Sequence, residues 1–397
     1  MNADRHRTGE HRVAGNRLTL LQNGTAYFPQ LCADIDAAQH SVYLETYIYA
    51  ADGSGHMVAE ALRRAAARGV TVRLLLDGFG SAELPQRWVD ELRTEGVEVQ
   101  WFRREVSPFT LQRSRRRRLY RLHRKLAVID DEIAFVGGIN IVDDIPQHGG
   151  ISEPRLDYAV RVQGTLAGAV LATMCRLWST VSWALLRRRS KAMNWRLSRT
   201  GMPAPDAPVA LLIRDSLRHR RDIERAYLRA IVGAHKEIVI ANAYFLPGRV
   251  FRRALIAAAE RGVRVVLLLQ GRVEYWVQHY ATQALYDRLF AAGIEIYEYR
   301  ASHLHAKVAV IDGMWATVGS SNIDPFSLLL AREANLVVQD AGFAQELRAS
   351  LLAEIASHGQ RVHRSGRSFW ARALARISYG AIRLLVGMFV LSGKRRE

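Results

Sequence analysis

The sequence predicts an α/β protein made of two similar domains, and two observations support this prediction. Segments with strand and helix patterns alternate along the chain, an order typical of layered α/β domains. The same order then returns in the second half of the 397 residues. A chain of this length can bury a large core and most often forms two domains.

The first half supplies its elements in a regular order. A strand rich in β-branched and aromatic residues is expected at Ser41–Tyr49, and a helix that begins at Met57 is expected to end before Gly69. The other expected elements are a strand at 18–21, a helix at 25–38, a strand at 70–76, a helix at 85–95 and a strand at 97–102.

Three stretches of the first half recur in the second half. The matching pairs are 38–49 with 234–245, 68–72 with 261–265, and 95–99 with 292–296. A repeat of this length indicates two similar domains rather than a solenoid. The expected organisation is a flexible tail at 1–16, a first domain at 17–186 with a basic insertion at 103–122, a linker at 187–207, a second domain at 208–360 and a basic amphipathic segment at 365–397.

One short motif, H-x-K-x4-D, occurs in both halves. Each copy has an apolar run between Lys and Asp, and each is followed at the same offset by Gly-x-x-Asn. A single copy arises easily by chance, and a lone His on a strand is most often structural, but two copies with the same companion make a functional role the better interpretation. The residues are His123, Lys125, Asp130 and Asn140 in the first copy, and His305, Lys307, Asp312 and Asn322 in the second.

The spacing of this motif suits phosphate chemistry. Residues i and i+2 of a strand project to the same face, so each His should lie beside its Lys. Two such faces brought together would hold a phosphate between two ammonium groups, while one His attacks phosphorus and the other protonates the leaving oxygen. Asn140 and Asn322 can add neutral hydrogen-bond donors. The residues alone do not distinguish the two histidines.

No metal or other cofactor is expected. The histidines are not spaced as i, i+4, and the sequence shows no carboxylate cluster of the kind that Mg²⁺ prefers.

The paired motif resembles the phospholipase D superfamily, and within it the bacterial cardiolipin synthases, over roughly Asn16 to Gln360. The resemblance implies two tandem phospholipase D-like domains, each a mixed β-sheet flanked by helices, with the active site at the domain interface. It also implies that Asp157 and Glu333 each orient the histidine of the opposite motif. This chain departs from the family in having Asp157 where a Glu is usual. Asp130 and Asp312 belong to the family signature, although their positions at strand ends are more typical of structural residues.

The resemblance further implies phosphatidyl transfer from one phosphatidylglycerol to another through a phosphohistidine, with release of glycerol. The family habit places the nucleophile in the first copy, at His123. Three alternatives stay open: a phospholipase D-type hydrolase, a nuclease of the same superfamily, and a non-enzymatic binding protein. Two motifs in one chain argue against the nuclease, because the small family nucleases carry one motif and dimerise. Intact His and Lys in both motifs argue against loss of activity.

The formal net charge of +18 indicates a polyanionic partner. The charge alone fits nucleic acid and an anionic membrane surface equally. The resemblance makes an anionic phospholipid membrane the expected partner, and nucleic acid is not expected. The insertion and a C-terminal helix at 368–392, with arginines on one face and apolar residues on the other, are predicted to contact it. The alternatives are a solvated loop and a helix packed on the domain. The proposed membrane-binding residues are Arg113, Arg115, Arg116, Arg117, Arg118, Arg372, Arg376 and Arg383.

The expected location is the cytoplasmic side of the cell inner membrane, with the protein attached peripherally. Two cysteines are too few for a disulfide framework and fit a reducing compartment. The polar start of the sequence has no apolar segment of the kind a signal peptide needs. The longest apolar stretch, 166–186, contains Arg176 and is predicted to be a core helix rather than a membrane span.

Overall fold

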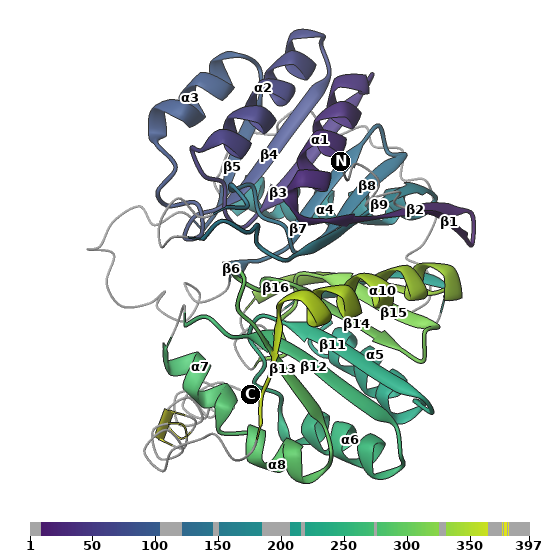
Figure 1. The fold of residues 1–397 in the computed structure, drawn as a ribbon. Helices are drawn as coiled ribbons and strands as arrows, with labels where there is room; N and C mark the ends of the chain where they lie inside the picture. Colours follow the sequence, from purple (N-terminus) through teal and green to yellow (C-terminus); the bar gives the residue numbers. More distant parts are fainter. Residues whose placement is uncertain are drawn as a thin grey trace, which may run out of the picture.

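The protein is described by a computed structural model over residues 9–103, 121–145, 151–184, 207–215, 219–273, 276–324 and 331–363, together with residues 375, 377, 378 and 380. These residues form two lobes, one above the other in Figure 1, and each lobe is built on one mixed β-sheet. The predicted α/β fold class is confirmed.

The first sheet comes from the first half of the chain. Its strands β3, β4 and β5 run parallel, and the neighbours on the other side of β3 are antiparallel. In spatial order the strands are β1 (Glu10–Val13), β2 (Asn16–Gln22), β9 (Tyr158–Gly164), β8 (Ile133–Gly137), β7 (Lys125–Ile129), β3 (Ser41–Thr46), β4 (Thr71–Asp77) and β5 (Glu98–Phe102).

The second sheet repeats this topology, which is the structural form of the internal duplication. In spatial order its strands are β10 (Val209–Arg214), β16 (Ala331–Gln339), β15 (Trp315–Gly319), β14 (Lys307–Ile311), β11 (Glu237–Asn242), β12 (Arg264–Gln270), β13 (Glu295–Tyr299) and β17 (Gly359–Arg361). One short strand from the first half of the chain, β6 (Arg121–Leu122), pairs with β16 of this second lobe. The two motif strands β7 and β14 occupy equivalent places in their sheets.

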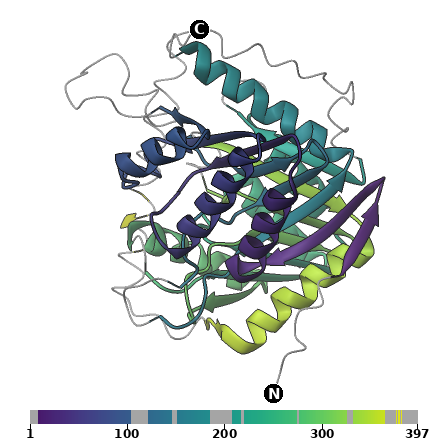
Figure 2. The same ribbon diagram turned by 90° about the horizontal axis from the view of Figure 1, so that it is seen from above.

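Helices cover the outer face of each sheet and also lie between the sheets. On the first lobe the outer helices are α1 (Asn23–Ala37), α2 (Gly53–Ala67) and α3 (Gln86–Thr94). On the second lobe they are α5 (Asp222–Val232), α6 (Arg249–Glu260), α7 (Trp276–Gln283) and α8 (Tyr286–Ala291). The inner helices are α4 (Leu166–Ala184) and α10 (Ala341–His358), which Figure 2 shows on opposite sides of the molecule.

One apolar core joins the two lobes. It contains side chains from the inner faces of both sheets and from α4 and α10, among them Val128 of β7 and Val310 of β14. The apolar runs 126–129 and 308–311 are buried throughout, as the sequence predicts. Because the lobes share this core, the motif strands are held at a fixed separation rather than on domains that move freely.

The start of the chain corrects one prediction. Residues 1–16 were expected to be a flexible tail, but Glu10–Val13 form β1, which pairs antiparallel with β2. The turn between them uses Ala14 and Gly15, both with positive φ (47° and 77°), a conformation that glycine adopts without strain. His11 on β1 also contacts Glu346 of α10. The strand therefore extends the first sheet and touches the second lobe.

The long apolar segment forms α4, whose residues such as Met174 and Cys175 are buried while Arg176 is exposed. The prediction of a core helix is confirmed. Within the described part of the chain, no helix has the length and hydropathy required to cross a membrane.

Several predictions concern residues outside the described ranges. These are most of the basic insertion, the linker except Ala207, and the C-terminal segment apart from its four described residues. The eight arginines proposed to bind a membrane all lie there. The predicted domain boundaries stay predictions.

Candidate active site

The two histidine segments are held by backbone pairing across the lobe interface. In the first copy β6 runs beside the start of β16, and the N–H of His123 donates to the carbonyl of Arg332 at 3.0 Å. In the second copy Leu156 pairs with Leu304, and the N–H of His305 donates to the carbonyl of Leu156 at 2.9 Å. Each histidine is therefore fixed to a segment of the opposite lobe.

The residue after each pairing partner is the predicted acid. Nδ1 of His123 lies 3.0 Å from Oε2 of Glu333, and Nδ1 of His305 lies 2.5 Å from Oδ2 of Asp157. Both carboxylates are almost fully buried, whereas the imidazoles are 16% and 22% exposed. An ionised carboxylate only accepts, so the ring proton is held on Nδ1 and the lone pair is left on Nε2, where it can attack or take a proton.

The two lysines lie within the same buried site. Lys125 is 3% exposed and Lys307 is 0% exposed. Each ammonium donates to the backbone carbonyl of the histidine two residues before it, at 2.7 Å for Lys125. The two buried ammonium groups repel each other, so a bound anion would be strongly favoured beside them.

Burial and the two lysines set the pKa values in the site. Burial lowers the pKa of His123, although Glu333 opposes this, and burial with both lysines lowers the pKa of His305 well below its usual value. Burial and the nearby Lys307 lower the pKa of Lys125 to about 7. Burial raises the pKa of Asp157 to about 6 even though Lys307 opposes it. The negative charge of a bound phosphate would offset the repulsion between the cationic groups. The pKa values of the histidines and of Lys125 would then rise.

The Gly-x-x-Asn stretches differ between the copies in a way that explains the two acids. A Cβ at Gly138 would lie 2.3 Å from Oδ1 of Asp157, so glycine leaves room for that carboxylate. The equivalent Ser320 instead donates its hydroxyl to Oε2 of Glu333 at 2.6 Å. The shorter acid, Asp157, lies against glycine, and the longer acid, Glu333, lies against serine. The Asp that stands where the family usually has Glu is therefore accompanied by a different neighbouring residue.

The two asparagines are buried, at 5% and 4% exposure. Asn140 Oδ1 accepts from the N–H of Ile48 at 3.2 Å. Asn322 Oδ1 is buried without a hydrogen-bond donor among the described residues. The supporting role expected of the two asparagines stays a proposal.

Asp130 and Asp312 act on the fold. Asp130 accepts from the N–H groups of residues 39, 40 and 41, and Asp312 accepts from those of residues 235, 236 and 237. These bonds lower the pKa of both aspartates against the opposing effect of burial. Both have positive φ, which Asp tolerates better than most residues. They tie the end of each motif strand to the start of β3 or β11.

Sequence reasoning missed two side chains that support the histidine segments. Asp77, at the end of β4, accepts from the N–H of Leu122 at 2.7 Å. Gln270, at the end of the equivalent strand β12, accepts from the N–H of Leu304 at 3.2 Å. Both bonds fix the residue directly before a motif histidine. The signal was present in the repeat, where a polar residue ends a run of three leucines in both copies.

The first lobe has two further contacts that the second lobe lacks. The ring of Tyr47 lies 4.8 Å from that of His123, and the Lys125 ammonium lies 5.3 Å from the centre of the Tyr47 ring. Arg124 forms a buried ion pair with Glu45 at 2.7 Å. The repeat places alanine at all three matching positions, Ala243, Ala306 and Ala241. The backbone of the site is therefore similar in the two lobes, whereas the side chains around the two histidines differ.

Comparison with solved structures defines the class of fold. The crystal structure of phosphatidylserine synthase from Haemophilus influenzae aligns over 94% of each chain with a TM-score of 0.67 and 14% identity. Polyphosphate kinase from Porphyromonas gingivalis aligns over 92% of this chain and 53% of that chain with a TM-score of 0.58 and 13% identity. At these identities the likeness concerns the fold alone.

Comparison of sequences defines the family. A family model described as cardiolipin synthase, PLD-like domain, matches residues 31–144 and 227–354. Cardiolipin synthase B of Escherichia coli strain K12 is 39% identical over 90% of this chain and 85% of its own length, and cardiolipin synthase A of Cronobacter sakazakii is 31% identical over 94% and 76%. The chain therefore belongs to the cardiolipin synthase family of phospholipase D-like proteins, and the resemblance seen in the motifs is confirmed.

Proposed function

We propose that the protein is a cardiolipin synthase that transfers a phosphatidyl group between two phosphatidylglycerol molecules. The observation that carries the proposal is the pair of histidines, each held by an acid of the opposite lobe, with two buried lysines beside them. The family and the names of its relatives support the lipid substrate. Domain bounds and residue roles are part of the same proposal.

In the first half of the reaction Nε2 of His123 attacks phosphorus of the donor lipid. A P–N bond forms, the P–O bond to the headgroup glycerol breaks, and His305 gives its Nε2 proton to the departing oxygen. Lys125 and Lys307 hold the two non-bridging oxygens, whose charge grows in the transition state. Burial and both lysines lower the pKa of His305 in the empty site, and the negative charge of a bound phosphodiester opposes this lowering, which favours the protonated acid that the step needs.

The second half runs in the opposite sense. His305 takes the proton of a headgroup hydroxyl on a second phosphatidylglycerol, and that oxygen attacks phosphorus as the P–N bond breaks. Cardiolipin leaves and His123 is regenerated. Glu333 and Asp157 touch only the histidines, so they serve as positioning residues that hold each tautomer and stabilise each imidazolium.

Membrane attachment is the second part of the proposal. The loops that follow β4 and β12 lie at the ends of the strands that support the histidine segments. Phe79, in the loop after β4, is 56% exposed, and Trp276, the first residue of α7, is 58% exposed. Exposed aromatic residues beside a site for a lipid headgroup suit shallow insertion into a bilayer. The arginines proposed from the sequence would add attraction to anionic lipid, and the cytoplasmic face of the inner membrane is the proposed location.

The test is incubation of the purified protein with vesicles containing labelled phosphatidylglycerol, followed by separation of the lipids and assay of free glycerol. Transfer yields cardiolipin and glycerol in equal amounts. Phosphatidic acid as the main lipid product would instead identify a hydrolase, and an unchanged lipid together with cleavage of labelled single-stranded DNA would identify a nuclease.

A further inference from the structure

The second lobe has a pocket where the first lobe has an aromatic ring. The repeat aligns Ala243 with Tyr47, whose ring in the first lobe packs on His123. Beside Ala243 the second lobe has an open pocket, whose other lining residues come mostly from the end of β12 and from α7 and α8.

The pocket adjoins His305 through two hydrogen bonds, one accepted by a backbone carbonyl and one by the side chain of Gln270. The N–H of Ala243 donates to the carbonyl of Ala306 at 3.0 Å, and Gln270 accepts from the N–H of Leu304. These two lining residues therefore hold the neighbours of His305 on either side. Among the described contacts, no hydrogen bond joins a residue that lines the pocket to His123 or to its two neighbours in the sequence.

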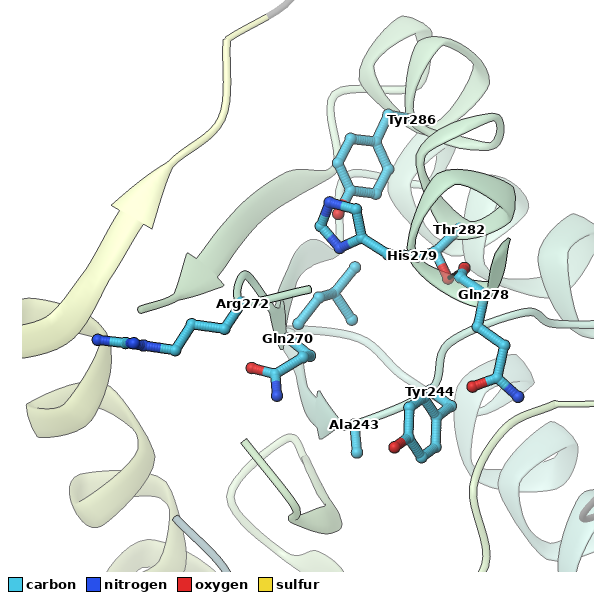
Figure 3. A pocket seen from close by; sticks show the side chains of 9 residues that line it. Ala243, Tyr244, Gln270, Arg272, Gln278, His279, Thr282 and Tyr286 are labelled. Carbon is cyan, nitrogen blue, oxygen red and sulfur yellow. Dashed lines mark hydrogen bonds between the residues drawn. The ribbon is translucent and has the colours of Figure 1, made fainter. Parts of the chain in front are cut away.

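The lining is rich in groups that bind hydroxyls. Figure 3 shows Gln270 and Gln278 on opposite sides of the pocket, His279 and Tyr286 at one end and Tyr244 at the other. Thr282 of α7 donates its hydroxyl to the carbonyl of Gln278, so its oxygen lone pairs remain able to accept.

Gln278 supplies the second observation that points to a ligand. Its side-chain oxygen Oε1 is buried and has no hydrogen-bond donor among the described residues. A buried amide oxygen without a donor is costly, and such an atom in a pocket wall commonly marks a missing partner. An alcohol is a donor of the required kind, and Glu298, the carboxylate bonded to the pocket residue Tyr286, already pairs with Arg300.

We propose that this pocket binds the glycerol headgroup whose hydroxyl exchanges a proton with His305. The inference rests on the proposed function and extends it by naming the alcohol subsite. Donor and acceptor glycerol share one subsite, because the departing and the attacking oxygen occupy the same place opposite His123. A held acceptor explains how the phosphohistidine is passed to a lipid hydroxyl rather than to water.

The experiment measures how the intermediate partitions between acceptors. The donor is phosphatidyl-p-nitrophenol in mixed micelles, whose leaving group needs neither the glycerol subsite nor a general acid. Attack by His123 releases p-nitrophenolate and forms the P–N bond. Water then gives phosphatidic acid, phosphatidylglycerol gives cardiolipin, and free glycerol gives phosphatidylglycerol. The two acceptor arms separate headgroup binding from binding of the lipid tails.

Gln278→Leu replaces the amide by a slightly smaller apolar side chain and should lower the ratio of transfer to hydrolysis about five-fold in both arms, the loss expected when one net hydrogen bond is removed. Ala243→Tyr copies the first lobe and should lower the ratio further. For Gln278→Leu the rate of p-nitrophenolate release should stay within about two-fold of the parent protein, because this activated donor needs no hydrogen bond from the glycerol subsite. Gln86→Leu, the same exchange at an exposed position of α3, is the matched control and should change nothing.

An unchanged ratio in both variants, with transfer intact in the parent protein, would overturn the subsite and leave the proposed function standing. A parent protein that releases p-nitrophenolate and yields only phosphatidic acid in both arms would overturn both. A loss confined to the lipid acceptor would assign the pocket to the tail region and would also contradict the proposal.

Discussion

The carboxylate of Glu333 lies 3.0 Å from Nδ1 of His123, although the two residues belong to different lobes. Asp157 and His305 repeat the relationship in the opposite direction. Because each lobe orients the histidine of the other, neither lobe alone contains a complete site. The duplication thus produces one active site rather than two.

The positioning acids should affect turnover far more than stability. Glu333→Gln keeps the shape but permits the wrong tautomer of His123, so kcat should fall on the order of 10³-fold or more, as for orienting carboxylates elsewhere. Asp130→Asn should show the opposite pattern, because it weakens three backbone hydrogen bonds remote from the histidines. It should cost about 1–3 kcal/mol of unfolding free energy and leave kcat of the folded protein nearly intact.

Denaturant unfolding and initial rates on both variants provide the measurements. If Asp130→Asn abolished turnover in a protein that remains folded, Asp130 would belong to the catalytic groups and its structural assignment would be wrong.

The pH dependence of kcat/KM should be bell-shaped, with a narrow optimum between about pH 6 and pH 7. Below about pH 6 Asp157 takes up a proton and no longer holds His305 by a charged bond. Above about pH 7 Lys125 of the free protein loses the charge that attracts the phosphodiester. Since kcat/KM reports the free protein, both limbs should appear there, and the alkaline limb of kcat should lie higher because bound phosphate retains the proton.

The same lysine should give the empty protein an unusual stability profile. The pKa of Lys125 is about 7 in the folded protein and 10.5 for an ordinary lysine, which represents the unfolded chain. Between these two pH values the unfolded chain therefore binds more protons than the folded protein. Stability should therefore rise with pH across that window, and Lys125→Met should remove this slope. A profile identical in the two proteins would show that the pKa of Lys125 is not depressed.

Turnover should continue in excess chelator. Lys125 and Lys307 supply the positive charge that a metal would otherwise bring to the phosphate. For the same reason Lys125→Ala and Lys307→Ala should each be severe. Loss of activity on chelation, restored by one particular ion, would count against the proposed mechanism. The measurement uses detergent-dispersed phosphatidylglycerol, so that chelation cannot act through vesicle aggregation.

Membrane binding should have a salt-sensitive and a salt-insensitive part. Neutralising Arg115 to Arg118 should weaken sedimentation with anionic vesicles mainly at low salt, since each basic residue contributes about 1 kcal/mol near the surface and the attraction is screened. Truncation at Ser368, or Phe79→Ser with Trp276→Ser, should weaken it at every salt concentration. Activity on a detergent-dispersed substrate should be largely retained. Unchanged sedimentation in all these variants would favour a different polyanionic partner.

Much of the site could be predicted from the sequence because the duplication made a short motif informative. The matched copies of the motif indicated the reactive pairs, and the apolar runs after each lysine indicated buried strands. The equivalence of Asp157 and Glu333 followed from the same alignment. These features are local, so pattern and spacing are enough to reveal them.

The rest depends on contacts that a local pattern does not record. The pairing of Leu156 with Leu304 joins segments that are far apart in the sequence, and the residues of neither segment indicate which segment it pairs with. The pocket beside Ala243 arises because a small residue replaces the ring of Tyr47, which becomes visible only when both lobes are compared in space. β1 was missed because four residues beside a short turn resemble a polar tail.

The central claim is that two histidines from different lobes divide one reaction, and trapping of the intermediate tests it most directly. With phosphatidyl-p-nitrophenol, which needs no acid, His305→Ala should release about one equivalent of p-nitrophenolate per chain and then stall, because the base for the second step is missing. The trapped lipid should be found on His123. His123→Ala should give no burst, and neither variant should make cardiolipin, although both should unfold at the same denaturant concentration as the parent. Sustained cardiolipin formation by either variant, or a burst from His123→Ala with the lipid on His305, would contradict the account.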